Sequence, residues 1–347
     1  MSKRFVTLGF VVAGLTVAMT AVPAFAAEQQ RPDLTKEVKS SYVPPKTPWG
    51  DPDIHGMWPL AHLQGTPFQR AKKDGDRQYL TDEEFKAQDE RQKKFAARYN
   101  QEIKNNKIGM GHWAEIGEAT RRTSLLVIPA DGQLPGMTKL GKERSAKMLS
   151  SYQDITWDSP ADFDSWDRCI TRGMPASMFP FMYNNGIEVL QAPGYVVIRL
   201  EMVHEARIIP LDGRPPLSNK ILQWMGSSRG HWEGNTLVIE TTNLQPGPSM
   251  LNVGTIGSRS RNNFPVSKNM KIVERLTPTS ANTIDYRITV SDPEDYTASW
   301  TADLPWVRDE SYRMFEYACH EGNDMIRNYI TSSRAKRAQE AAAAAKK

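Results

Sequence analysis

The chain has 347 residues, 39% of them hydrophobic and 24% charged, with a formal net charge of +4. Lys3 and Arg4 contribute two of these charges, so the rest of the chain carries +2. This near balance excludes the concentrated basic face that nucleic-acid binding requires, and the length allows one large domain or two modest ones.

Residues 1–26 have the three parts of a secretory signal peptide. Lys3 and Arg4 form the positive start, residues 5–22 are uncharged and mostly apolar, and Ala24-Phe25-Ala26 offers small residues for cleavage. A membrane anchor is the alternative, because about 18 apolar residues can span a bilayer. The Ala-x-Ala site favours cleavage. We therefore expect a periplasmic or secreted protein with no membrane span once the signal is removed.

Residues 27–165 are predicted to form an N-terminal arm, helices and a first strand. The arm, 28–48, is polar and rich in proline, and a turn-rich aromatic segment follows at 49–58. Thr81-Asp82-Glu83-Glu84 is typical of a capping box and predicts a polar surface helix that runs to about 104. A strand-like run at 123–128 and a second helix over roughly 139–152 complete this part.

Residues 166–330 have the pattern of an antiparallel meander. β-branched and aromatic residues alternate in runs at 187–191, 195–210, 236–242, 270–276, 283–290, 298–304 and 314–320. Short turn signals separate most of these runs. A meander this long must cover its edges or close, which predicts a calycin-type, lipocalin-like barrel. A long Gly/Ser/Asn-rich loop interrupts it at 247–265, and residues 331–347 are predicted to form a flexible or helical tail.

The only cysteines are Cys169 and Cys319. In an exported protein, two cysteines favour a disulfide over a metal pair, and this one would close a loop of about 150 residues. Two free buried thiols are the alternative. The bond would tie the start of the β-region to its end.

Several strings resemble a widespread family of exported, mostly uncharacterised bacterial proteins. They are 167–173 (DRCITRG), 183–186 (YNNG), 192–198 (APGYVVI), 232–243 (WEGNTLVIETTN, ending at Asn243) and 317–323 (YACHEGN). The resemblance covers most of residues 48–330. It implies an exported, lipocalin-like β-structure whose shared polar residues gather in these strings.

Established enzyme signatures are absent from the sequence. It has no Gly-x-Ser-x-Gly, His-Glu-x-x-His, Gly-x-Gly-x-x-Gly or Walker string, which disfavours serine hydrolases, zincins and nucleotide enzymes. Export also disfavours chemistry that needs ATP or NAD(P)H, so no cofactor is predicted. A zinc site of His204, His231 and His320 is geometrically possible in a barrel, but their spacing gives it no support and no metal is predicted.

The strand predicted over 195–210 carries the main candidate site. Alternation places His204 on the apolar face, where a partly desolvated imidazole can act as a general base or remain a satisfied structural histidine. Glu201 and Arg207 share the charged face. That face is either a solvent-exposed ladder of ion pairs or the lining of a ligand cavity, and a bulge would exchange the two faces.

Two further strings supply candidate residues. His320 and Glu321 follow Cys319 and are predicted as a second acid/base pair, with structural pairing as the alternative. Tyr183 and Asn184 fit a turn first and substrate positioning second, and Asn243 is added to the predicted substrate-binding set.

The leading hypothesis is a periplasmic, cofactor-independent acid/base enzyme of the lyase, isomerase or hydratase type. It would act on a small apolar or aromatic molecule. His204 would transfer the proton, Glu201 or Glu321 would assist it, and Arg207 would bind substrate oxygen. The alternative is a periplasmic lipocalin-like carrier of a hydrophobic ligand, in which both His204 and His320 are structural.

Overall fold

The computed structural model describes residues 31–107, 109, 114–147, 156–246 and 265–346. The predicted signal peptide lies outside these residues, as does almost all of the loop predicted at 247–265. The chain divides into two compact units, Met1–Asp33 and Leu34–Lys347. Only residues 31–33 of the first unit are described, and the features below all belong to the second.

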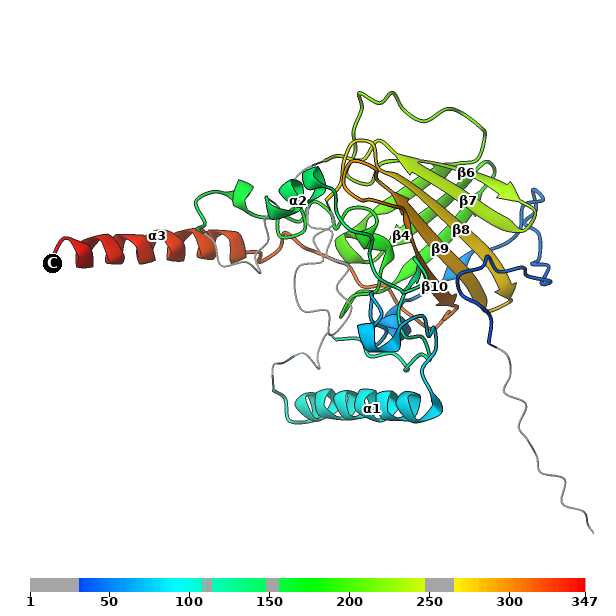
Figure 1. Cartoon of the computed structure of the whole chain (residues 1–347), viewed down its shortest axis with the longest axis horizontal. Helices are drawn as coiled ribbons and strands as arrows, with labels where there is room; N and C mark the ends of the chain where they lie inside the picture. Colours follow the sequence, from blue (N-terminus) through cyan, green and yellow to red (C-terminus); the bar gives the residue numbers. More distant parts are fainter. Residues whose placement is uncertain (1–30, 108, 110–113, 148–155, 247–264, 347) are drawn as a thin grey trace, which may run out of the picture. The chain divides into compact units, whose positions relative to one another are not determined.

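The described residues form two antiparallel sheets. One has the strand order β1-β3-β4-β5 and the other β2-β10-β9-β8-β7-β6, and Figure 1 shows β6 to β10 running side by side. The strands are β1 (Gly56–Met57), β2 (Leu126–Ile128), β3 (Ile187–Ala192), β4 (Tyr195–Leu200), β5 (Ala206–Pro210), β6 (Ser227–Glu233), β7 (Thr236–Thr242), β8 (Lys271–Ser280), β9 (Thr283–Ser291) and β10 (Trp300–Val307).

The mainly β fold class is confirmed, but the predicted barrel is not. Neither sheet closes on itself within the described residues, and the larger one has β2 and β6 as its edges. β5 of the smaller sheet lies next to β6 without a hydrogen-bonded ladder between them. One edge of each sheet, β5 and β6, is therefore covered by contact between the two sheets instead of by ring closure.

One apolar core joins the two sheets. Val189 and Ile198 contribute to it from the smaller sheet, and Ile239, Ile288 and Trp300 from the larger one. Alternate residues of β8 are buried, as expected for a strand with one face on a core. Because the core is continuous, a side chain that points inward from either sheet reaches the same interior.

The predicted surface helix is confirmed as α1 (Asp82–Lys104). The Thr81 hydroxyl accepts a hydrogen bond from the Glu84 amide, and the Glu84 carboxylate accepts one from the Thr81 amide, which completes the capping box. No α1 side chain is buried. Among the described residues, no helix is long and apolar enough to cross a membrane.

Two shorter helical predictions are also met in part. The helix predicted over 139–152 is α2 (Lys139–Ala146), and residues 148–155 lie outside the described residues. The tail is helical as α3 (Met325–Ala344), which begins before the predicted tail. The expected strand at 123–128 is reduced to β2.

Two of the strand predictions are wrong. Residues 195–210 are not one strand, because the chain turns at 201–205 and pairs β4 with β5, with Ile198 opposite Arg207. Residues 314–320 are not a strand at all, and β6 was not predicted. By contrast β7 has the predicted bounds, and β3, β8 and β9 begin or end within a few residues of theirs.

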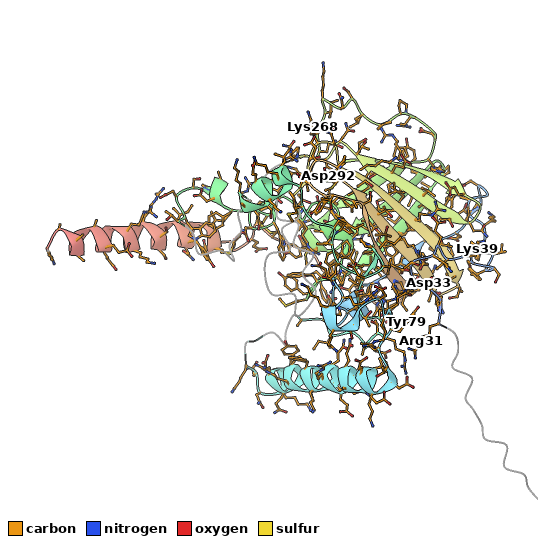
Figure 2. The ribbon with its side chains drawn as sticks, in the orientation of Figure 1. Arg31, Asp33, Lys39, Tyr79, Lys268 and Asp292 are labelled. Carbon is orange, nitrogen blue, oxygen red and sulfur yellow. A yellow bond between two sulfur atoms is a disulfide. The ribbon has the colours of Figure 1, made fainter. Side chains whose placement is uncertain are left out.

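The chain enters β8 at a fixed point. The amide and hydroxyl of Ser267 donate hydrogen bonds of 2.8 and 2.7 Å to the carboxylate of Asp292, which follows β9 and is labelled in Figure 2. Both residues are buried. The Glu294 amide also donates to this carboxylate, at 3.2 Å, so the buried group is well satisfied and holds the residues before β8 against the end of β9.

Candidate functional site

The predicted disulfide is present. The Cys169 and Cys319 sulfurs are bonded, with the two Cα atoms 5.5 Å apart across a sequence separation of 150 residues. The bond joins the segment before β3 to the segment after β10. Asn323 reinforces this junction, because its side-chain amide donates to the Asp167 carbonyl at 3.1 Å.

A cavity of about 550 Å³ lies against this bond, and we call it the disulfide pocket. Three predicted site residues, Tyr183, Asn184 and Glu321, line it together with Cys319. The full lining is Trp166, Asp167, Tyr183, Asn184, Glu316, Tyr317, Ala318, Cys319, Glu321, Gly322, Asn323, Met325 and Tyr329. Residues that are more than 150 positions apart in sequence therefore share one concave surface.

Two aromatic residues of the lining, Trp166 and Tyr183, pack against Phe181. Trp166 packs edge-on against Phe181 with centroids 4.8 Å apart, and Phe181 packs edge-on against Tyr183 at 5.1 Å. The buried guanidinium of Arg172 lies 5.0 Å from the Phe181 ring centroid and 5.6 Å from that of Trp166. Burial lowers the pKa of Arg172 to about 10. These packed rings make this part of the pocket wall rigid and give it polarisable aromatic surface.

Glu201 lies behind the pocket as a saturated hydrogen-bond acceptor. One oxygen receives Asn184 Nδ2 at 3.0 Å and the Phe315 amide at 2.8 Å, and the other receives the Gly186 amide at 3.0 Å and the Tyr312 hydroxyl at 2.6 Å. The side chain is buried. The expected solvent-exposed ladder is therefore wrong for Glu201, which ties residues 184–186 to residues 312–315.

Close packing around Glu201 depends on a glycine. A Cβ added at Gly186 would lie 2.7 Å from Glu201 Oε2 and 2.8 Å from Tyr312 Cε1. Asn184, two residues earlier, has φ +52°, a left-handed conformation that asparagine tolerates. The Tyr183-Asn184-Asn185-Gly186 string bends at Tyr183 but is not the hydrogen-bonded turn expected from the sequence, and it brings Tyr183 and Asn184 to the pocket.

Glu115 is a part of this network that the sequence did not reveal. Its carboxylate accepts the Tyr312 hydroxyl at 2.9 Å, the Asn184 amide at 2.8 Å and Asn185 Nδ2 at 2.9 Å. Glu115 belongs to no helix or strand, so no periodic pattern signals it. Its importance follows only from tertiary contacts.

His204 lies at the edge of this region but not where alternation placed it. It is exposed, so the expected partial desolvation is wrong. Its ring Nδ1 is 2.9 Å from the carbonyl oxygen of Tyr317, a residue that lines the disulfide pocket. Val203 and His204 both have left-handed φ angles, 59° and 47°, and this turn moves the imidazole out of the β4 register.

Glu205 is the neighbouring group whose titration is shifted. Burial raises its pKa to about 7, although the Thr171 hydroxyl donates to its carboxylate at 2.5 Å. Desolvation outweighs that hydrogen bond and the attraction of nearby cationic groups. A carboxyl that changes charge near neutral pH therefore lies one residue from His204.

Arg207 lies in the core between the sheets. Its Nη1 and Nη2 are 2.8 and 2.5 Å from the two carboxylate oxygens of Glu274 on β8, and the Tyr286 hydroxyl donates to Glu274 at 2.7 Å. The Arg207 side chain is 2% exposed and that of Glu274 is 0% exposed. The solvent-exposed ladder is wrong here too. Arg207 lines neither of the two described pockets.

The remaining predicted residues are not brought together with the disulfide pocket. Asn243 uses its amide to donate to the carbonyls of Leu217, Ser218 and Ile221, which holds a loop. His320 is exposed and does not line the pocket, although Glu321 does. Within the described residues, no group of three or more His, Cys, Asp or Glu side chains is placed to hold a metal ion.

A second cavity, of about 270 Å³, was not predicted. We call it the Arg308 pocket. Its lining is Tyr42, Pro44, Pro45, Asp53, Ile54, His55, Trp58, Pro278, Ser280, Ala281, Asn282, Ile284 and Arg308. The turn-rich aromatic segment at 49–58 was the one sequence signal for it. That segment did not indicate which residues would complete the cavity. Several of them come from the region of the β8–β9 turn, and Arg308 directly follows β10.

Comparison with known proteins identifies no relative. No family model, no curated protein and no solved structure matches the chain. The family resemblance carried by the sequence strings therefore stays a prediction.

Proposed function

We propose that the chain is a small-molecule-binding protein and that the disulfide pocket is its ligand site. The observation that carries this proposal is the way the pocket is held. A covalent bond at Cys169–Cys319 and the four hydrogen bonds to Glu201 fix segments distant in sequence around one cavity. A cavity held in this way loses little conformational freedom when a ligand enters, which favours binding.

The lining favours a ligand with an aromatic or apolar body and a cationic end. Tyr183 and Tyr317 offer aromatic surface, while Asp167, Glu316 and Glu321 bring three carboxylates. Among the residues that the structure describes, no Lys, Arg or His lines the pocket. Aromatic faces and carboxylates together suit an organic ammonium group. This refines the hydrophobic ligand expected from the sequence.

Arg172 is a cation next to the pocket and would repel a cationic ligand. Its guanidinium lies against the Trp166 and Phe181 rings, is buried, and is not among the lining residues. Three carboxylates on the lining outnumber it. We therefore expect a net preference for cations at the pocket mouth.

An acid/base enzyme is the second candidate, and one observation favours it. Glu205 has a pKa near 7 and adjoins His204, whose ring reaches the carbonyl of a pocket residue. A pair of this kind can move a proton near neutral pH. Against it, His204 is exposed and Glu201 already accepts four hydrogen bonds, so the proton-transfer roles of His204, Glu201, His320 and Glu321 stay predictions.

We also infer an oxidising compartment. A disulfide within the chain favours a periplasmic or secreted location over a reducing cytosol. The lipocalin-like relationship stays a prediction as well. The ligand-site proposal does not depend on it, because the pocket lies at the disulfide and not inside a closed barrel.

Calorimetric titration of the intact chain tests the proposal. Benzylammonium is expected to bind, and benzyl alcohol, its neutral counterpart, about tenfold more weakly or less. Glu321→Gln and Tyr183→Ala should each weaken benzylammonium binding. Glu340→Gln, an exposed change on α3 outside the pocket, is the matched control and should leave it unchanged.

Two results would contradict the proposal. Equal affinity for benzyl alcohol would remove the cationic ligand class, and binding unaffected by Glu321→Gln and Tyr183→Ala would remove the pocket. For the enzyme alternative, His204→Ala is expected to abolish turnover of a substrate while the protein stays folded. Native mass spectrometry of protein from its own host adds a check, because a retained, unmodified ligand favours binding over turnover.

A further inference from the structure

The Arg308 pocket has a guanidinium group fixed in its wall. Arg308 Cζ lies 4.6 Å from the ring centroid of Trp58, whose side chain is only 1% exposed. A planar guanidinium over an indole face gains cation–π and stacking energy. The stacked partner is part of the main core, so Arg308 rests on a rigid surface.

Gly56 leaves room for this arrangement. It has φ +140°, and a Cβ at this position would lie 2.8 Å from Arg308 Nη1 and 3.0 Å from Cζ. Any other residue would have to push the guanidinium away. Trp58 and Gly56 together therefore define where the head group of Arg308 lies.

One edge of that head group has no acceptor. Nη1 donates to the carboxylate of Glu310 at 3.1 Å, and the Glu310 side chain is 61% exposed. Nε is buried and has no hydrogen-bond partner, whereas Nη2 is not buried and makes no hydrogen bond to a described residue. Nε is too buried for a ligand in the cavity to reach, so Nη2, next to the Nη1 that pairs with Glu310, is the donor left for such a ligand.

We propose that the Arg308 pocket binds a small organic carboxylate. The Nη1–Nη2 end of a guanidinium matches the two oxygens of a carboxylate, and the fork geometry makes the pair specific; here Nη2 has no partner among the described residues, and the acceptor on Nη1 is the exposed Glu310. The apolar part of the ligand would lie against Ile54 and Ile284, which also line the cavity. This site is separate from the disulfide pocket and does not depend on the function proposed there.

The other charges of the pocket favour a monoanion. Asp53 also lines it, and its carboxylate pairs with the ring Nδ1 of His55 and accepts the His55 amide at 3.1 Å. Arg308 and Asp53 balance each other among the lining residues. A single carboxylate therefore suits the pocket better than a multiply charged phosphate, for which one guanidinium is a poor match.

Calorimetric titration of the full chain with benzoate and with benzamide tests this inference. Benzoate is expected to bind, and benzamide about tenfold more weakly or less, since it lacks the charge and the second acceptor oxygen. Arg308→Gln should reduce benzoate affinity about tenfold or more. Arg308→Lys should also weaken it, because lysine keeps the charge but not the planar fork.

Arg313→Gln is the matched control. Arg313 is exposed, follows five residues later and donates to the backbone carbonyls of Glu310 and Tyr312. The Arg313→Gln variant should bind benzoate with the same affinity as the unaltered chain. Urea unfolding of each variant checks that the fold is kept, and Arg308→Gln should leave benzylammonium binding unchanged.

Several results would overturn the inference. They are the absence of benzoate binding, equal affinity for benzamide, benzoate affinity unchanged in Arg308→Gln, or equal losses in Arg308→Gln and Arg313→Gln. Inorganic phosphate that binds as tightly as benzoate would overturn the carboxylate class. A Glu321→Gln variant that loses benzoate binding would show that the probe occupies the disulfide pocket instead.

Discussion

The hydroxyl oxygen of Tyr312 lies 2.6 Å from a carboxylate oxygen of Glu201 and, on its other side, 2.9 Å from Glu115. A phenol has one proton to donate, so the two carboxylates share one donor. Burial, and then the hydrogen bond to Glu201, raise the pKa of Tyr312 above its ordinary value. The phenol thus stays protonated and keeps two acidic groups in one place.

Tyr312→Phe should destabilise the protein by about 1–3 kcal/mol, because it removes the donor and leaves two carboxylates facing each other. Urea unfolding measures the loss. Tyr42→Phe is the matched control, since the Tyr42 hydroxyl makes no hydrogen bond to a described residue. Equal stability of the unaltered chain and Tyr312→Phe would show that the hydroxyl contributes nothing to the network.

Reduction of the disulfide should both destabilise the chain and weaken benzylammonium binding. A loop of this length corresponds to a loss of up to about 4–5 kcal/mol on chain-entropy grounds. The urea midpoint with and without dithiothreitol measures the first effect, and calorimetry the second. The Cys169→Ser/Cys319→Ser double variant should have the urea midpoint and the benzylammonium affinity of the reduced protein, and dithiothreitol should change neither. Unchanged binding after reduction would argue against the pocket's dependence on the bond.

Glu205→Gln should change how stability depends on pH. The folded-state pKa of Glu205 is near 7, above its ordinary value of 4.5, so folding favours the protonated form. That contribution is fully present below about pH 4.5 and is lost as pH rises through 7. Glutamine does not ionise, so the variant does not lose this stability as the pH rises. The free energy of unfolding of Glu205→Gln should exceed that of the unaltered chain by about 1–2 kcal/mol at pH 8.5 and differ little from it at pH 4.5.

Thermal unfolding at the two pH values measures this difference. Asp164 and Asp285 also have pKa values raised to about 7 by burial, so they move the stability of both proteins in the same direction. Subtracting one curve from the other isolates Glu205. A gain of the same size at pH 4.5 and 8.5 would mean that the substitution acts through packing and not through charge.

Local signals in the sequence predicted much of the fold. The capping box at Thr81 located α1, the alternation at 236–242 located β7, and the pair of cysteines, in a chain expected to be exported, predicted their bond. Each of these depends on a few neighbouring residues or on a single chemical rule. Barrel closure depends instead on which edges meet, and alternation carries no information about that.

The candidate site was harder to predict, for the same reason. Residues 195–210 look like one strand because alternation continues across the turn at 201–205. Glu201 is held there by donors from 184–186 and 312–315, and the left-handed Val203 follows. A β-branched residue with positive φ is not expected from sequence. Glu115 and Arg308 had no pattern at all, since their roles arise only from contacts between distant segments.

The buried ion pair of Arg207 and Glu274 provides the sharpest test of that correction. Arg207→Met leaves the Glu274 carboxylate in the core without its cation and should cost about 3–5 kcal/mol. Adding Glu274→Gln removes the stranded charge while an amide oxygen can still accept the Tyr286 hydroxyl. The double variant should therefore recover part of the loss, as measured by urea unfolding of both singles and the double. If Arg207 instead lined a ligand site open to water, Arg207→Met would cost less than 1 kcal/mol and the second change would rescue nothing.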